Sequence, residues 1–298
     1  MDTLKKYHNL GNDLINKLKL TEYPVAVKMI KKGETVPESA VRPLDYFGYE
    51  VPPCVTYTYC KKTGTSFYVT GDDVACKPIS ICFGFRKPSD PDDLFRAWEK
   101  HAGYKINAEM EKKSREDDVY FAPFEFEGFL VSPLHETLVE PDIVMIYCTP
   151  LALSHLTTAA TYDGQTILSN FNGMESSCKE GIMRTFKANK CNVVIPGMGD
   201  RLLSANQDSE VIFSIPNDQL DYVNENLYRY GSKIADQSPF GFPHHPLFLG
   251  DVMWFNQHQE PGVWPDLREK LGEKPEGHFK ENIKYKLVKR LAPFLKYF

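Results

Sequence analysis

The chain has 298 residues, of which 42% are hydrophobic and 25% charged, values typical of a folded globular protein and not of a disordered or fibrous one. Lysines and arginines number 35 against 40 aspartates and glutamates, which gives a formal net charge of -5. This sign disfavours nucleic acid, a polyanion, as the main partner. A chain of this length forms a sizeable core, so its stability does not demand disulfides or a structural metal.

The sequence also bears on the cellular compartment. No stretch approaches the roughly 20 apolar residues that a membrane-spanning helix needs. The first residues are interrupted by charges and show no small-residue cleavage site, so they do not resemble a secretory signal. We therefore expect a cytoplasmic protein that does not act on a membrane. In that reducing compartment seven cysteines, an odd number, favour thiols, catalytic groups or metal ligands over disulfides.

The first predicted elements are a helix, a strand and a hairpin. The helix begins near Asp2, and residues 25–30 form a β-branched run typical of a strand. Two further β-favouring segments, 56–59 and 66–70, flank Lys61–Gly64 and predict a hairpin. Apolar residues recur along the helix at steps of three and four residues and form one face: Leu4, Tyr7, Leu10, Leu14 and Leu18.

The middle of the chain changes from helical to extended patterns. Between Asp90 and Asp118 we predict a helix with an apolar face, a stop at Gly103, and a second, charged and solvated segment. From Val119 to Leu130 aromatic and acidic residues alternate, which is the period of a half-buried strand.

From residue 142 onward predicted strands and helices alternate. This pattern favours an α/β or α+β fold, with a mixed sheet flanked by helices and with helical extensions at both ends. We expect one compact domain over residues 1–298; a division into a cysteine-rich lobe of about 1–130 and an α/β lobe of about 131–298 stays open. The predicted strands are 143–148, 166–171, 192–195 and 211–215, and the predicted helices are 151–162, 177–188, 218–230 and, with a basic outer face, 279–295.

Four cysteines, Cys54, Cys60, Cys76 and Cys82, are candidate metal ligands. They form two C-x5-C pairs, and steps of six residues keep side chains on one face of an extended backbone. The pairs lack the tight C-x2-4-C spacing of zinc ribbons. Iron–sulfur clusters draw thiolates from distant segments, so the spacing permits one. The alternative is that these thiols are ordinary core residues, because free cysteines are among the most buried residue types.

Cys178 is the candidate for a reactive thiol. Ser177 and Glu180 have the spacing of a capping box, which would place Cys178 in the first turn of a helix. There the helix dipole and free N–H groups favour the thiolate, the nucleophilic and metal-binding form. Burial would raise the pKa of the thiol and disfavour the thiolate, so a packing role for Cys178 stays open. Cys148 and Cys191, at strand ends among aliphatic residues, are interpreted as packing.

A further candidate is an anion site at Gly197-Met-Gly-Asp-Arg201, which follows a predicted strand. Backbone N–H groups near Gly197 and Gly199, together with the Arg201 guanidinium, suit a carboxylate or phosphate. The segment lacks the third glycine of the dinucleotide fingerprint and the GK[ST] of a P-loop. The alternative is a tight turn in which Asp200 and Arg201 form a salt bridge.

Taken in order, several segments of the chain resemble one known family. The first half contributes residues 24–28, the run Cys54–Gly64, residues 68–70, Cys76 and Gly84, and the second half contributes Pro150, residues 162–164, Cys178, residues 197–201 and residues 215–216. Over about residues 20–230 this order is similar to that of the uncharacterised ArCR family, domain of unknown function 169.

The resemblance implies a fold and a recurrent set of cysteines, here Cys54, Cys76 and Cys178, but no activity. The family's second half often carries a cysteine directly after the glycine that matches Gly197. This chain has Met198 there, so a four-cysteine site shared with relatives does not carry over.

Three functions follow from these patterns. In the first, Cys54, Cys76 and Cys178, with or without Cys60 or Cys82, hold a metal ion or iron–sulfur cluster for redox chemistry or sensing. In the second, a metal-free thiol enzyme uses Cys178 while Arg201 orients an anionic substrate. In the third, an aromatic-lined pocket binds a small molecule, consistent with 19 Phe and 16 Tyr. A homo-oligomer is compatible with all three.

Overall fold

The computed structural model describes residues 2–90, 105–171, 173, 175–227 and 229. The chain divides into two units, 1–232 and 233–298, and all described residues belong to the first. The predicted last helix at 279–295 and the predicted helical face between Leu94 and His101 lie outside the described residues.

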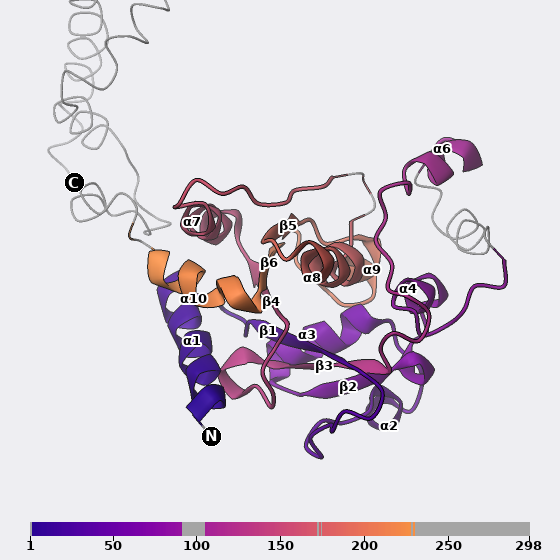
Figure 1. The fold of residues 1–298 in the computed structure, drawn as a ribbon, viewed down its shortest axis with the longest axis horizontal. Coiled ribbons are helices and arrows are strands. Elements are labelled where there is room, and N and C mark those ends of the chain that lie inside the picture. The colour runs from indigo at the N-terminus through magenta and orange to yellow at the C-terminus, as the bar shows by residue number, and fades with distance from the viewer. Residues whose placement is uncertain (1, 91–104, 172, 174, 228, 230–298) are drawn as a thin grey trace, which may run out of the picture. The chain divides into compact units, whose positions relative to one another are not determined.

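A six-stranded sheet organises the first unit (Figure 1). Its order is β2-β3-β1-β4-β6-β5, and every ladder between neighbouring strands is antiparallel. Among the described residues, parallel pairing occurs as isolated bridges, such as Leu168 with Asn192. The strands are β1 (Val25–Ile30), β2 (Phe67–Thr70), β3 (Gly128–Pro133), β4 (Ile143–Cys148), β5 (Asn192–Val194) and β6 (Val211–Pro216).

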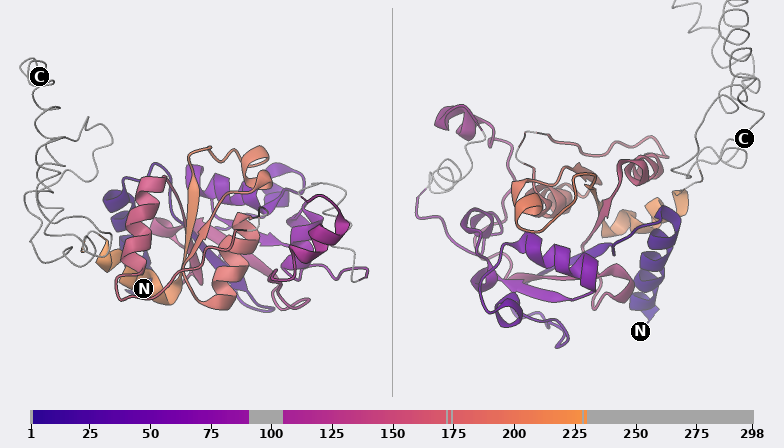
Figure 2. Two further views of the ribbon diagram at one scale, coloured as in Figure 1. Left: turned by 90° about the horizontal axis from the view of Figure 1, so that it is seen from above. Right: turned by 180° about the vertical axis from the view of Figure 1, so that it is seen from behind.

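Helices cover both faces of this sheet, which confirms the predicted class of a sheet flanked by helices. The expectation of mixed pairing is wrong, since the ladders between neighbouring strands are antiparallel. Figure 1 shows α1, α7 and α10 on one side of the strands and α3, α8 and α9 on the other, and Figure 2 shows the same arrangement from two further directions. The helices are α1 (Asp2–Leu18), α2 (Pro43–Phe47), α3 (Pro53–Thr63), α4 (Lys77–Cys82), α6 (Ala108–Lys113), α7 (Pro150–Ala160), the π-helix η3 (Ser177–Arg184), α8 (Thr185–Ala188), α9 (Met198–Leu202) and α10 (Asn217–Asn226), with short 3-10 turns η1 (Gly71–Asp73) and η2 (Leu134–Glu136).

Alternation along the strands separates two cores. Because successive side chains of a strand point to opposite faces, Val25 and Val27 enter one core and Ala26 enters the other. The core beneath α3, α4 and η3 is rich in aromatic and sulfur-containing side chains, and we call its side the thiol face. The core beneath α1, α7 and α10 is rich in leucine, isoleucine and valine, and we call its side the aliphatic face.

The N-terminal helix is confirmed, and it packs on the aliphatic face. Leu10, Leu14 and Leu18 are buried there, as their three- and four-residue spacing predicts. Gly11 allows the close approach of α1 to η2, since a Cβ at this position would lie 2.5 Å from the backbone nitrogen of His135.

The predicted hairpin is wrong in its first half. Residues 56–59 belong to α3, whereas residues 67–70 form β2. Pro53 occupies the first turn of α3 and Gly64, at φ 77°, ends it, donating its N–H to the Cys60 carbonyl. These end signals, and burial of one side of the helix against the sheet, outweigh the β-propensity of its threonines and tyrosines.

Two other predicted strands are shorter than expected. In the 119–130 segment β3 begins only at Gly128, and the preceding aromatic residues are held by single backbone bonds, such as Phe121 N–H to the Cys82 carbonyl. In the 166–171 segment the pairing is limited to the bridge at Leu168. Phe121 and Phe126 are nevertheless buried, so the alternating pattern reports burial of the rings rather than membership of the sheet.

Candidate thiol site

The five candidate cysteines, Cys54, Cys60, Cys76, Cys82 and Cys178, all belong to the core of the thiol face or pack against it. Cys54 lies in the first turn of α3, Cys178 lies in the first turn of η3, and Cys76 precedes α4 as its N-cap residue. A negative charge on Cys54 or Cys76 raises the pKa of the Cys178 thiol, and a charge on Cys76 raises that of Cys54. The fold therefore brings thiols that are far apart in sequence within electrostatic range of one another.

Burial dominates the protonation of this cluster. Cys54 and Cys178 are 6% and 4% exposed, whereas Cys76 is partly exposed. Burial, followed by the charges of Cys54 and Asp200, raises the pKa of Cys178 well above its usual range. Burial is also the first cause of the raised pKa values of Cys54 and Cys76. All three thiols are consequently protonated at neutral pH in the absence of a bound cation.

The start of η3 differs from the predicted capping box by one residue. The N-cap is Ser176, whose Oγ accepts the Lys179 N–H at 3.1 Å, and Ser177 is already inside the first turn. The Ser177 hydroxyl instead donates to the Asp200 carboxylate. Cys178 does lie at the helix start, but the desolvation of its buried thiol outweighs the effect of the helix end.

Asp200 links η3 to α9 at the edge of the cluster. It is 2% exposed, and its Oδ2 accepts N–H groups from Ser177 at 3.1 Å and from Gly197 at 2.9 Å. Burial raises the pKa of this carboxyl group, while the Ser177 hydroxyl and these two backbone bonds act to lower it. The interpretation of Asp200 as a partner of Arg201 is wrong, since Arg201 pairs with Asp208. The signal for the observed role was the three-residue spacing from Gly197 to Asp200, which suits a helix cap.

Aromatic and small residues enclose the thiols. The Tyr57 hydroxyl donates to the Cys178 Sγ at 3.5 Å, and Tyr57 is fully buried. The side chain of Ser204 is hydrogen-bonded to Cys54, which acts to lower the pKa of that thiol. A Cβ added to Gly199 would lie 3.9 Å from the Cys54 Sγ, so the start of α9 passes directly beside this sulfur.

The other cysteines have different surroundings. Cys60 is fully buried in the same core, and burial alone raises the pKa of its thiol. The Cys82 thiol is influenced first by burial and then by Asp118, Lys179 and Cys76. Cys148 and Cys191 lie in the core of the aliphatic face, on the opposite side of the sheet. Their packing there agrees with the sequence interpretation.

A buried ion network lies beside the thiols. Lys179, the residue after Cys178, pairs its Nζ with the Asp118 Oδ1 at 2.6 Å, and both side chains are almost completely buried. Asp118 also pairs with Arg115 at 3.5 Å. This network ties the first turn of η3 to the segment that follows α6.

The groups of the predicted anion site have partners within the protein. The Gly197 N–H donates to Asp200, as described above. The Arg201 guanidinium donates to the backbone carbonyls of Pro196 at 3.1 Å and Gln207 at 3.3 Å. Gly199 lies beside Cys54, since a Cβ at this position would be 3.9 Å from the Cys54 Sγ.

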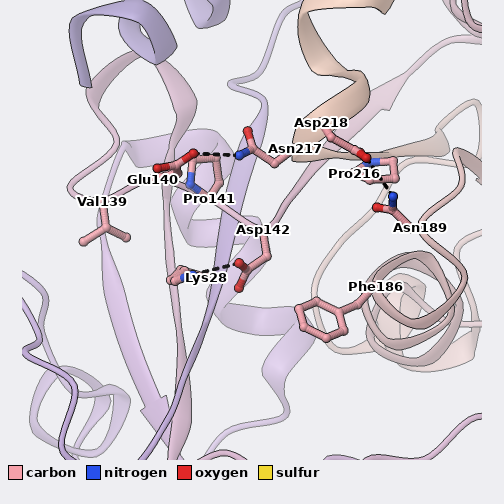
Figure 3. Close-up of a pocket in the computed structure, with 10 residues that line it drawn as sticks. All are labelled: Lys28, Val139, Glu140, Pro141, Asp142, Phe186, Asn189, Pro216, Asn217 and Asp218. Carbon is pink, nitrogen blue, oxygen red and sulfur yellow. Dashed lines mark hydrogen bonds and ion pairs between the residues drawn. The ribbon is translucent and has the colours of Figure 1, made fainter. Parts of the chain in front are cut away.

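A separate open pocket of about 630 Å³ lies at one end of β4 and β6 (Figure 3). Its lining includes two polar pairs, Lys28 with Asp142 at 2.8 Å and Asn217, which donates to Glu140 at 3.0 Å. Phe186 is the one aromatic ring among its lining residues, and no cysteine lines it. The pocket thus differs from the aromatic-lined pocket predicted for a small-molecule-binding protein.

The thiol cluster is not a ready-made metal site. Within the described ranges, no three His, Cys, Asp or Glu side chains stand in an arrangement that could hold a metal ion. Nor does any helix of that part of the chain combine the length and apolar character needed to cross a bilayer.

These features define a class of α/β protein in which an antiparallel sheet separates an aliphatic core from a core that encloses clustered thiols. The chain belongs to the uncharacterised ArCR family, domain of unknown function 169, which it matches over residues 13–226. This match confirms the resemblance seen in the sequence. Neither the curated proteins nor the solved structures contain a significant match to the chain.

Proposed function

We propose that Cys54, Cys76 and Cys178 bind a thiophilic metal ion or an iron–sulfur cluster, with a role in redox chemistry or sensing. The observation that carries this proposal is that Cys54, Cys76 and Cys178, each at the start of a different helix, share one core and influence one another's pKa. A core that needs only apolar volume does not require sulfur at three such positions. Cys60 and Cys82 have surroundings that fit packing or support better than ligation.

In this proposal, metal binding requires deprotonation of the three thiols and rotation of their side chains. A metal cation reverses the electrostatic balance of the cluster, because it stabilises the thiolates that burial disfavours. The three protons are released to solvent on binding, so affinity rises with pH. Because the metal-free side chains are not arranged for coordination, they must rotate toward the ion.

The proposal fits a reducing compartment, the cytoplasm, where thiols persist. All seven cysteines are free in the structure, and the sheet places two of them, Cys148 and Cys191, on the opposite face. These two provide matched controls for any cysteine substitution. We propose a metal or cluster as the partner and expect neither a nucleic acid nor a membrane to take part.

The test is purification of the full chain without oxygen, followed by elemental analysis and an absorption spectrum. We expect a stoichiometric metal and a thiolate-to-metal charge-transfer band. Cys54→Ser, Cys76→Ser and Cys178→Ser should each lose most of the metal, whereas Cys148→Ser, Cys191→Ser and Cys60→Ser should retain it. Absence of metal from the anaerobic wild type, or equal losses in the control variants, would overturn the proposal.

A second candidate is metal-free thiol chemistry at Cys178, which the hydrogen bond from Tyr57 favours because it orients the sulfur. Its raised pKa acts against nucleophilic attack at neutral pH. Rapid alkylation of Cys178 in metal-free protein, with Cys191 as the slow reference thiol, would support this candidate. Alkylation of Cys178 no faster than that of Cys191 would exclude it.

A further inference from the structure

We infer that the open pocket at the end of β4 and β6 binds a small organic cation that carries N–H donors, an aliphatic amine or a guanidinium compound (Figure 3). Its volume of about 630 Å³ is within the range of small-molecule sites. The inference is independent of the proposed metal-binding function, because no cysteine lines this pocket. It follows from the charge of the lining, from its uncommitted acceptors and from its aromatic ring.

The lining of the pocket has an excess of negative charge. It contains one cation, Lys28, and three carboxylates, Glu140, Asp142 and Asp218, which gives a formal charge of -2. The Lys28 Nζ lies 2.8 Å from the Asp142 Oδ1, so this ion pair offsets one carboxylate and leaves the other two. The hydrogen bond from Tyr7 lowers the pKa of Glu140, which is therefore charged at neutral pH. This balance favours a cationic ligand over an anionic one.

The amide donors of the lining are already bonded to these two carboxylates. The Asn217 Nδ2 donates to the Glu140 Oε1 at 3.0 Å, and the Asn189 Nδ2 donates to the Asp218 Oδ2 at 2.7 Å. The second oxygen of each carboxylate, Oε2 of Glu140 and Oδ1 of Asp218, accepts no hydrogen bond from the described residues. The pocket therefore presents acceptors that suit a ligand with several N–H groups.

A further acceptor of the lining is unsatisfied. The Asn217 Oδ1 is buried, and no described residue donates to it. A buried acceptor without a donor is unfavourable. An N–H group of a bound ligand would supply the donor after a small rotation of the amide. This observation points to a hydrogen-bond-donating ligand and does not depend on the charge of the pocket.

Phe186 provides the apolar part of the site. Two other rings hold it in edge-to-face contacts, Phe121 at 5.5 Å and Phe126 at 5.7 Å between ring centres. A fixed ring beside carboxylates suits an organic cation, because the carbon chain covers the ring while the charged N–H groups reach the carboxylates. A bare metal ion fits less well, since no group of three potential ligands among the described residues is arranged to hold one.

The experiment is calorimetric titration of the full chain at low salt with agmatine, which carries an ammonium and a guanidinium group. We expect saturable binding of one agmatine per chain that weakens as sodium chloride is added. The neutral diol 1,4-butanediol and the dianion adipate should not bind. These two probes separate recognition of the cation from general entry of a small molecule into the pocket.

Variants of the lining locate the site. Glu140→Gln, which keeps an acceptor for Tyr7 and Asn217, and Asp218→Asn should each weaken agmatine binding about tenfold. Phe186→Leu should weaken it about threefold. The matched control is Asp221→Asn, which removes an exposed carboxylate of α10 that pairs with Lys6 and does not line the pocket. This variant should bind agmatine like the wild type.

The outcomes separate this inference from the proposed function. Absence of saturable agmatine binding to the wild type, or equal binding of 1,4-butanediol, would overturn the inference and leave the metal-binding proposal untouched. Equal weakening in Asp221→Asn and Glu140→Gln would overturn the assigned position. Because the titration needs no bound metal, a metal-free preparation that binds agmatine would support this inference even if the proposed function fails.

Discussion

The two faces of the sheet bury comparable numbers of side chains with different chemistry. The aliphatic face is filled by residues such as Leu14, Leu156 and Leu220, which gain stability simply by leaving water. The thiol face contains buried groups that are costly to dehydrate, among them Lys61 and Asp200. Replacing such groups by apolar residues is often neutral or stabilising, so their presence agrees with the proposal of a functional site on the thiol face.

The largest effect should come from Lys61, a fully buried cation on the thiol face. Its Nζ lies 2.5 Å from Glu22 and 2.8 Å from Glu210, and 4.2 Å from the centre of the Tyr147 ring. Lys61→Ala removes the buried cation from Glu210 and leaves Glu22 with only the more exposed Lys62, so we expect the free energy of unfolding to fall by about 3–5 kcal/mol. Urea denaturation measures this change.

The neighbouring Lys62→Ala is the control for that prediction. Lys62 also pairs with Glu22, at 3.5 Å, but its side chain is 37% exposed, so its loss should cost less than about 1 kcal/mol. Equal losses in the two variants would show that the buried position of Lys61 is not the reason for the effect.

On the aliphatic face, Leu156→Ala should destabilise the protein by about 3 kcal/mol through lost burial and a residual cavity. Leu156 is fully buried in α7, whereas Leu202 in α9 is 73% exposed. Leu202→Ala should therefore change stability by less than about 0.5 kcal/mol. On the proposed function, the folded Leu156→Ala variant should bind as much metal as the wild type; a parallel loss of metal would contradict the separation of the two faces.

A pH experiment examines a thiol on the aliphatic face. Burial, followed by the charge of Asp218, raises the pKa of Cys191 to about 12. An unfolded thiol titrates near pH 8.5, so its contribution to stability is present below that pH and is lost as the pH rises toward about 12. Cys191→Ser removes this titration. Between pH 9 and 10 the free energy of unfolding should fall by up to about 1.4 kcal/mol more in the wild type than in the variant, as measured by urea midpoints. If the stability of both proteins depends on pH in the same way, the raised pKa of Cys191 is contradicted.

The smallest effect should come from Tyr7, whose hydroxyl donates to Glu140 at 2.8 Å. This bond is the first cause of the lowered pKa of Glu140. A carboxyl group with a lowered folded pKa stabilises the protein above its unfolded pKa of about 4.3, and the contribution disappears as the pH falls through the folded value. Tyr7→Phe should lower the free energy of unfolding by about 1 kcal/mol at pH 7 and by less at pH 3, as measured by urea denaturation. A loss that is the same at both pH values would show that packing alone is responsible; Tyr162→Phe, at a half-exposed position, is the control.

Local signals predicted part of this structure well. The β-branched runs 25–30 and 143–148 are strands, and the leucines of the first helix face the core as their spacing indicates. The 56–59 segment was misassigned because its threonines and tyrosines favour strands, while the end signals at Pro53 and Gly64 were decisive. Strand order and the antiparallel pairing depend on contacts between distant segments, which no local pattern encodes.

The site shows the same limit. The position of Cys178 at a helix start was predictable from local spacing, and the resemblance grouped it with Cys54 and Cys76, which belong to or pack against the same core. The raised pKa of Cys178 was not, because it depends on how deeply the folded chain buries that thiol. The cap formed by Asp200 was also missed, since it joins two helices whose contact only the tertiary structure creates. The roles of the three cysteines as ligands stay a prediction.

The sheet order has a consequence for how the protein is made. β1 is synthesised early, yet its neighbours in the sheet are β3 and β4, at residues 128–133 and 143–148. A nascent chain on the ribosome therefore holds the β1 edges unpaired until these later strands emerge. Cys54 and Cys76 leave the exit tunnel well before Cys178, so during translation their sulfur atoms meet the cellular metal and oxidant pools without the protection of the finished fold.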